Sequence, residues 1–386
     1  MTPRPMTPES KLPEVGTTIF TVMSALAAEH GAINLSQGFP DFEPPCFLLD
    51  RVAAHLHAGR NQYAPMAGVP ALVEAVAGKA GELYGAEVDP ATEITVTSGA
   101  TEALFCAIHA VVRPGDEVIV FDPAYDAYEP AVRLAGGRTV HLPLAAPDFA
   151  LPWPALEQAL TPRTRLVIIN SPHNPTGAVL AAADLARLGS LLAGRECYVL
   201  ADEVYEHIVF DGAAHVSVLA EPSLRERSFA VFSFGKTYHA TGWKVGYAVA
   251  PPALTAEFRK VHQFVTFTTS TPMQWALADM LREHPEHHRD LSAFYQARRD
   301  RFREMLAPSR FELLPCAGTY FQLADYGRIS DEPDSEFARR LTTEHGVAAI
   351  PVSVFYDSPP DARLVRFCFA KEEETLARAA EVLCRI

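Results

Sequence analysis

Short apolar runs alternate with helical patterns through the middle of the chain. Runs typical of strands cover residues 93–99, 117–122, 164–170, 197–203, 228–234 and 244–250. Stretches such as 100–112 and 181–194 lie between some of them and carry apolar residues at helical spacing. This alternation is typical of a mostly parallel sheet with helices on both faces. The sequence therefore predicts an α/β fold in which ligands gather at the carboxyl ends of the strands.

The pattern changes after about residue 285. A long amphipathic helix is predicted over 287–306, and strands are predicted at 311–316, 319–326, 347–355 and 364–369, before a closing helix. Strands with intervening helices favour a second, smaller α/β domain. We expect an N-terminal arm that joins the small domain over 1–44, a large domain over 45–285 and a small C-terminal domain over 286–386.

Composition narrows the classes of function. The 386 residues carry a net charge of −14, and the basic residues are scattered, which disfavours a nucleic-acid partner. No run of about 18 apolar residues exists to span a membrane, and the first residues lack the apolar core of a signal peptide. Six cysteines are spread along the chain without a CxxC pair. We expect reduced thiols and therefore a cytoplasmic location.

Lys236 follows an apolar run, VFSF, and a glycine, Gly235. A lysine at the end of a buried strand is costly unless its ammonium is paired or its pKa is lowered. A lowered pKa is what a Schiff-base nucleophile needs. Taken alone, the residue also fits an ordinary loop edge, so the other strand ends must decide.

Polar and aromatic residues follow two further strands. Gly99, Ala100 and Thr101 begin a predicted helix, where free amides, the helix dipole and a hydroxyl make an anion or phosphate site, or where the threonine is a simple cap. Tyr125 follows a strand and a proline turn. This tyrosine is suited either to stacking on a planar ligand or to ordinary packing.

Two more strand ends carry amides and a carboxylate. Asn170 and Asn174 lie in a loop stiffened by two prolines, which holds a side-chain amide at the sheet edge. Asp202 ends the next strand, with Tyr205 three residues on. A buried carboxylate needs a cationic or hydrogen-bonding partner, and the alternative is a helix-capping aspartate.

One ligand accounts for all these groups together. Pyridoxal phosphate has an aldehyde for a lysine, a ring nitrogen for a carboxylate, a phenolate oxygen, a flat ring and a phosphate. Lys236 would bind the aldehyde and Asp202 the ring nitrogen. The remaining contacts would come from Asn174 and Tyr205 at the phenolate, Tyr125 on the ring, and Thr101, Ser233 and Lys244 at the phosphate.

The segments NSPHNPTG, ADEVY and SFGKTYHATGWKVGY, in this order, resemble the cofactor-binding motifs of fold-type I pyridoxal-phosphate enzymes, specifically the class I/II aminotransferases. The resemblance runs essentially end to end. It implies a mostly parallel seven-stranded sheet between helices, a smaller α/β domain, and a homodimer with shared active sites. It also implies that Tyr63 reaches the neighbouring subunit's phosphate and that Gly38 lies in the substrate loop. Arg366 is expected to bind the substrate α-carboxylate, with Asn174 as a further contact at the same group.

The variant GWKVGY places Lys244 where many relatives have a phosphate-binding arginine. Together with SQGFPDF, NQYAPM, GTYF and AAIPVSVFY, it resembles the methionine and kynurenine/glutamine aminotransferase branch. The resemblance implies ping-pong transfer of an amino group to a 2-oxo acid, with Lys236 as Schiff-base lysine and general base. No metal is expected.

The expected substrate is an uncharged L-amino acid: methionine, or else glutamine, an aromatic amino acid or kynurenine. Residues 261–281 contain no lysine or arginine, whereas dicarboxylate-specific relatives use an arginine from the partner subunit. Candidate pocket residues are instead Phe20, Tyr63, Phe267 and Tyr320.

Two alternatives remain open. A cysteine-conjugate β-lyase of the same fold would share the lysine, the aspartate and the arginine. A ligand-sensing regulator would carry a basic helix-turn-helix module ahead of the fold, and about 30 residues precede the substrate loop here.

Overall fold

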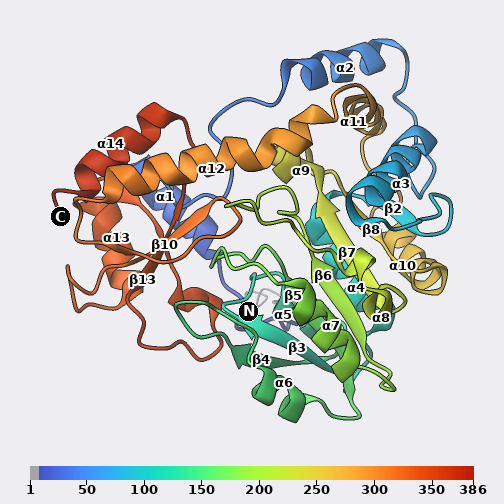
Figure 1. Ribbon diagram of the computed structural model, residues 1–386, viewed down its shortest axis with the longest axis horizontal. Coiled ribbons are helices and arrows are strands. Elements are labelled where there is room, and N and C mark those ends of the chain that lie inside the picture. Colours follow the sequence, from blue (N-terminus) through green and yellow to red (C-terminus); the bar gives the residue numbers. More distant parts are fainter. Residues whose placement is uncertain (1–7) are drawn as a thin grey trace, which may run out of the picture.

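A seven-stranded sheet forms the centre of the computed structural model, which describes residues 8–386. The strand order is β2-β8-β7-β6-β5-β3-β4 (Figure 1). The strands are β2 (Ile94–Thr97), β3 (Glu117–Asp122), β4 (Arg138–Pro143), β5 (Thr164–Asn170), β6 (Tyr198–Asp202), β7 (Ser228–Ser233) and β8 (Gly246–Val249). Strand β8 runs antiparallel to both of its neighbours, β2 and β7, and the remaining pairs are parallel. The predicted mostly parallel sheet is confirmed.

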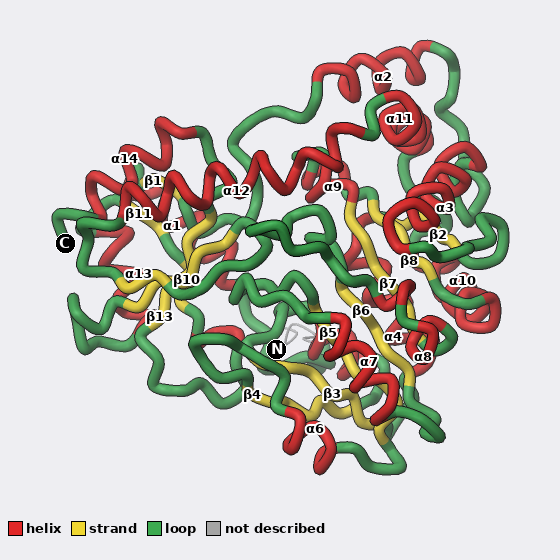
Figure 2. Tube along the Cα trace, in the orientation of Figure 1, coloured by secondary structure: helices red, strands yellow, loops and turns green. Residues whose placement is uncertain are grey.

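Helices cover both faces of this sheet, as Figure 2 shows. Val118 and Val120 of β3 pack in one apolar cluster with α4 (Gly99–Val111), α5 (Tyr128–Leu134) and α10 (Pro252–Val265). Ile119 and Phe121 pack in the cluster on the other face, with α2 (Cys46–His57), α3 (Pro70–Tyr84), α7 (Ala182–Leu191) and α11 (Thr271–Glu283). Successive strand residues point to opposite faces, so a strand with both faces covered is apolar throughout.

A smaller four-stranded antiparallel sheet has the order β12-β13-β10-β9. Its strands are β9 (Glu312–Leu313), β10 (Phe321–Asp325), β12 (Ile350–Pro351) and β13 (Leu364–Cys368). A separate apolar cluster joins this sheet to α1 (Ile19–His30), α12 (Glu286–Leu306), α13 (Asp334–Thr343) and α14 (Glu373–Leu383). The long helix α12 extends from the neighbourhood of α11 to that of α14 (Figure 1).

The prediction of one strand over 347–355 is wrong. β11 (Val347–Ala348) pairs with β1 (Ile33–Asn34) in a separate two-stranded sheet, β12 pairs with β13, and Ser353–Phe355 form a 3-10 turn. The segment 347–352 is apolar and buried throughout, so the sequence carries no alternation that would mark the change of sheet. Strand β4 was not predicted, since as an edge strand it has a polar, partly exposed sequence.

Three short α-helices and two 3-10 helices complete the described secondary structure: α6 (Trp153–Ala159), α8 (Pro222–Arg225), α9 (Phe234–Thr237) and the 3-10 helices at Val218–Ala220 and Thr241–Trp243. Within residues 8–386, no helix is long and apolar enough to cross a membrane. Asp122, Asn170, Asp202 and Ser233 end four parallel strands, so they lie along one edge of the large sheet.

Candidate active site

A cavity of about 290 Å³ opens at this edge of the large sheet. Its walls come from the ends of β5, β6 and β7, the start of α4, and segments that belong to the smaller sheet and its helices. Of the residues that the sequence predicts for the site, Tyr63, Phe267 and Tyr320 are not among those that line the cavity. The cavity is lined by the others: Phe20, Gly38, Gly99, Ala100, Thr101, Tyr125, Asn174, Asp202, Tyr205, Ser233, Lys236, Lys244 and Arg366.

Lys236 lies on the one-turn helix α9, which begins directly after β7. Its Nζ donates to the Tyr320 hydroxyl at 2.9 Å and to the Gly38 carbonyl at 3.1 Å. Desolvation inside the protein lowers the pKa of this amine to about 8. Lys236 is therefore available as a neutral nucleophile close to neutral pH.

Asp202 is a buried carboxyl at the end of β6. Tyr128 donates its hydroxyl proton to Oδ2 at 2.6 Å, and Oδ1 accepts a longer bond of 3.4 Å from the Val204 N–H. Burial raises the pKa of Asp202 to about 6, against the opposing effect of the Tyr128 hydrogen bond. A cationic ring nitrogen at this point would hold the carboxylate in its charged form.

Arg366 lies on β13 and is completely buried. Its Nη1 donates to Asn174 Oδ1 at 2.7 Å and its Nη2 donates to the Ser36 carbonyl at 3.0 Å. The guanidinium lies 3.8 Å from the centre of the Phe321 ring. Burial lowers the pKa of Arg366 to about 10, so the group stays charged at neutral pH. Because these hydrogen-bond partners are neutral oxygens, the positive charge remains for a carboxylate ligand.

The opposite end of the cavity is suited to a phosphate. Helix α4 begins at Gly99, whose φ of +77° lies in the left-handed region. A Cβ added to Gly99 would lie 3.3 Å from Lys244 Nζ, so the ammonium lies beside the helix N-terminus. Amides at a helix start together with a lysine favour a dianion.

Tyr63 lies outside the cavity of its own subunit. Its side chain is 86% exposed, and its ring packs edge-on against Phe267 with 5.8 Å between centroids. Phe264 nearby in the chain is 84% exposed. The structure therefore brings Tyr63 and Phe267 together on the surface, away from Lys236.

Two residues gain roles that the sequence did not indicate. Tyr128 lies three residues after Tyr125, and nothing in the local sequence identifies it as the partner of Asp202. Tyr320 was a candidate for its aromatic ring alone, whereas its hydroxyl contacts Lys236 and donates to the Gly38 carbonyl at 2.6 Å. Both contacts join residues far apart in the chain, so no local signal could have revealed them.

The sequence is similar to known proteins along almost its whole length. It matches the family described as aminotransferase class I and II over residues 30–383. It is 57% identical over 383 residues to methionine aminotransferase of Escherichia coli, covering 99% of each chain. It is 35% identical to kynurenine–oxoglutarate transaminase 3 of Mus musculus, covering 95% of this chain and 87% of the relative.

Solved structures agree with the sequence comparison. The crystal structure of YbdL from Escherichia coli, described as having a methionine aminotransferase function, superposes with a TM-score of 0.97 at 57% identity. The match covers 99% of this chain and 100% of that one. The resemblance to class I/II aminotransferases and the fold-type I architecture are therefore confirmed.

The cavity offers an amine of lowered pKa, a buried carboxyl, two further cations and a helix N-terminus, and these groups fit pyridoxal phosphate and an amino acid. With this site, the family match and the relatives at high coverage, the chain belongs to the pyridoxal-phosphate-dependent aminotransferases of class I and II.

Proposed function

We propose that this enzyme transfers the amino group of an uncharged L-amino acid, foremost methionine, to a 2-oxo acid in a ping-pong cycle. The observation that carries this proposal is the number of cations that line the cavity in the described chain: Lys236, Lys244 and Arg366. Cofactor aldehyde, phosphate and substrate α-carboxylate would each use one of them. None of the three is left for a side-chain carboxylate, and residues 261–281 offer no lysine or arginine to a neighbouring subunit. The 57% identity to methionine aminotransferase supports methionine among uncharged substrates.

The walls near Arg366 support the same substrate class. Phe20 and Phe321 line the cavity beside the guanidinium, at 5.3 and 3.8 Å from its carbon. A thioether or an aromatic side chain suits such a surface, because both gain from burial and from contact with aromatic rings.

Each part of the cofactor has a partner in the cavity. Lys236 would bind the aldehyde and Asp202 would face the ring nitrogen. Asn174 and Tyr205 would bind the phenolate oxygen, and Tyr125 would stack on the ring. The phosphate would be held by Gly99, Ala100, Thr101, Ser233 and Lys244, with Tyr63 of the adjacent subunit.

Pyridoxal phosphate, when bound, supplies an electron sink for the bond that breaks at the substrate Cα. Arg366 would orient the substrate by two parallel N–H donors on its α-carboxylate, with Gly38 and Phe20 beside it. The amine of Lys236 would take the proton from the substrate Cα and deliver it to C4′, the aldehyde carbon of the cofactor. The Tyr320 hydroxyl and the Gly38 carbonyl would hold this amine while it is free.

A homodimer with shared active sites is part of the proposal. Tyr63, Phe264 and Phe267 expose large aromatic surface outside the cavity, and clusters of this kind are typical of protein interfaces. A cytoplasmic location is supported by six free cysteines, four of which are buried.

The proposed domains are 1–44 as an arm and part of the small domain, 45–285 as the large domain, and 286–386 as the small domain. The separate apolar cluster around the smaller sheet supports these limits, because it includes Met23 and Leu35 from the first segment. Helix α12 begins at Glu286.

The absorption spectrum of the purified protein tests the proposal. L-methionine should lower the long-wavelength band of the bound cofactor and raise the shorter-wavelength band of its aminated form, and Lys236→Ala should lose both changes. Release of pyruvate and ammonia from a cysteine conjugate would instead favour the β-lyase alternative, although the relatives named above are described as aminotransferases. A band that methionine and aromatic amino acids leave unchanged would contradict the substrate class.

A further inference from the structure

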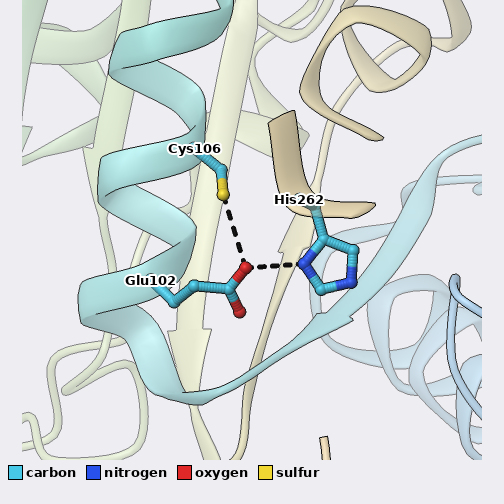
Figure 3. A group of neighbouring side chains, drawn as sticks. All are labelled: Glu102, Cys106 and His262. Carbon is cyan, nitrogen blue, oxygen red and sulfur yellow. Dashed lines mark hydrogen bonds and ion pairs between the residues drawn. The ribbon is translucent and has the colours of Figure 1, made fainter. Parts of the chain in front are cut away.

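A buried group of three polar side chains lies behind the phosphate end of the cavity (Figure 3). Glu102 and Cys106 lie one turn apart on α4, and His262 comes from α10. Glu102 belongs to the same first turn of α4 as Gly99, Ala100 and Thr101, the proposed phosphate contacts. The three side chains do not line the cavity, so the proposed chemistry leaves them without a role.

Glu102 fixes the start of α4 through its own carboxylate. Its Oε2 accepts the backbone N–H of Ser98, the residue that precedes the helix, at 2.6 Å. Within residues 8–386, the Ser98 side chain itself accepts no capping hydrogen bond from the helix. Glu102 thus holds the turn from the side away from the cavity, and the amides of the turn stay free for an anion.

His262 compensates the charge of this carboxylate. Its Nδ1 lies 2.6 Å from Glu102 Oε1, and its Nε2 lies 3.1 Å from the carbonyl oxygen of Met66. A carbonyl can only accept, so Nε2 carries a hydrogen, and a further proton lies between Nδ1 and the carboxylate. That proton offsets a negative charge that would otherwise repel a phosphate at the same helical turn.

The contact with Met66 joins the phosphate end of the cavity to the segment that carries Tyr63. This segment is also bound to the large sheet, because the Val96 N–H donates to the Ala67 carbonyl at 2.9 Å. His262 lies two residues before the exposed Phe264. One imidazole therefore contacts both the first turn of α4 and the segment that carries Tyr63.

Cys106 completes the group as a weak donor. Its Sγ lies 3.4 Å from Glu102 Oε1, and burial raises the pKa of the thiol, so the sulfur keeps its proton. Each ligating atom of the carboxylate and the imidazole already has a partner, which is the pattern of a hydrogen-bonded relay rather than of an open metal site.

We propose that Glu102 and His262 are positioning residues that hold the phosphate-binding turn of α4 against the Tyr63 segment. Within the pair, His262 neutralises the charge of the Glu102 carboxylate. This inference rests on the proposed phosphate site. The pair acts through the backbone of residues 98–101, and we expect its effect on the phosphate of the cofactor rather than on the ring or the aldehyde.

The test compares the affinity of the apoprotein for pyridoxal phosphate with its affinity for pyridoxal, which lacks the phosphate. Glu102→Ala and His262→Leu should weaken binding of pyridoxal phosphate about tenfold or more, because each removes hydrogen bonds of a charged pair. Binding of pyridoxal should change much less. Glu102→Gln should retain most of the affinity, since its amide can accept from Ser98 and donate to His262.

Cys106→Ala serves as the matched control, because it removes an equally buried side chain from the same group. It should lower thermal stability without changing the ratio of the two affinities. Hydrogen exchange gives a second readout: inorganic phosphate should protect residues 61–68 in Glu102→Gln more strongly than in His262→Leu.

An unchanged ratio of affinities in folded Glu102→Ala and His262→Leu would overturn the positioning role and leave the phosphate site intact. Wild-type protein that binds pyridoxal as tightly as pyridoxal phosphate would overturn the phosphate site itself. Stoichiometric zinc in the purified protein, lost in Cys106→Ala, would make the group a metal site and also overturn the proposal.

Discussion

Lys236 and Asp202 lie in one cavity, and burial shifts the pKa of each group in the direction that favours its neutral form. For Lys236 the unfolded chain binds more protons than the folded one from about pH 8 to 10.5, so the contribution of this group to stability rises with pH over that window. For Asp202 the folded chain binds more protons between pH 3.8 and about 6, so its contribution falls as pH rises. A ligand that stabilises the charged forms of Lys236 and Asp202 would offset the loss of folding stability that their burial causes.

The pKa of Lys236 predicts how fast the apoprotein takes up its cofactor. Only the neutral amine attacks an aldehyde, so the uptake rate should rise with pH about a midpoint near 8. Absorbance after rapid mixing with pyridoxal phosphate gives this rate. Tyr320→Phe should lower the midpoint, because it removes an acceptor for the Lys236 ammonium. A midpoint at about 10 or above, the range of a solvated lysine, would contradict the burial argument.

Tyr128 predicts a second effect at this scale. Tyr128→Phe should reduce kcat for methionine about tenfold, because Asp202 loses a hydrogen bond that favours its charged form. The matched comparison is the double mutant with Asp202→Asn. If Tyr128 acts through the carboxylate, the double mutant should be no slower than Asp202→Asn alone, and independent losses that multiply would contradict that role.

At the scale of elements, β8 lies directly against the first turn of α4. A Cβ added to Gly246 would lie 2.7 Å from the Phe232 carbonyl oxygen and 2.9 Å from the Ala100 nitrogen. Such distances leave no room for a methyl group, so strand and turn would have to separate.

Gly246→Ala is therefore expected to destabilise the fold by about 1–3 kcal/mol and to weaken binding of pyridoxal phosphate. Thermal unfolding and cofactor titration measure the two effects. Gly78→Ala in the middle of α3 is the control, because within residues 8–386 nothing lies within 4 Å of its added Cβ. It should stabilise by about 0.5–1 kcal/mol. Equal behaviour of the two variants would exclude the packing explanation.

At the scale of the whole molecule, the exposed position of Tyr63 matters most. Its side chain is 86% exposed and outside its own cavity, as a residue that serves a neighbouring subunit should be. The proposed sharing of sites makes a definite prediction for mixed dimers of Lys236→Ala with Tyr63→Phe, since one of the two sites would hold both native residues.

Lys236→Ala should be inactive. Tyr63→Phe should bind the cofactor weakly and should therefore be slow at low cofactor concentration. Mixed dimers, formed by unfolding and refolding the two variants together, should recover activity at low cofactor concentration. Activity no higher than that of the two variants assayed apart would show that each site is complete within one chain.

The sequence by itself determined the α/β class and most of the polar residues that line the cavity. It could do so because strand, turn and polar residue follow one another locally: Lys236 after β7, Asp202 at the end of β6 and Gly99 after β2. Parallel strands bring such ends to one edge, so a local pattern repeated along the chain predicts a shared site.

The tertiary structure alone decided which of these groups support each other. Tyr128 and Asp202 are 74 residues apart, Lys236 and Tyr320 are 84 apart, and Glu102 and His262 are 160 apart. It also decided where the apolar run 347–355 changes from one sheet to another. Contacts over such separations depend on how the layers of helices and strands pack. A hydrophobic or polar pattern along the chain indicates which face a residue occupies, but not which residue it contacts there.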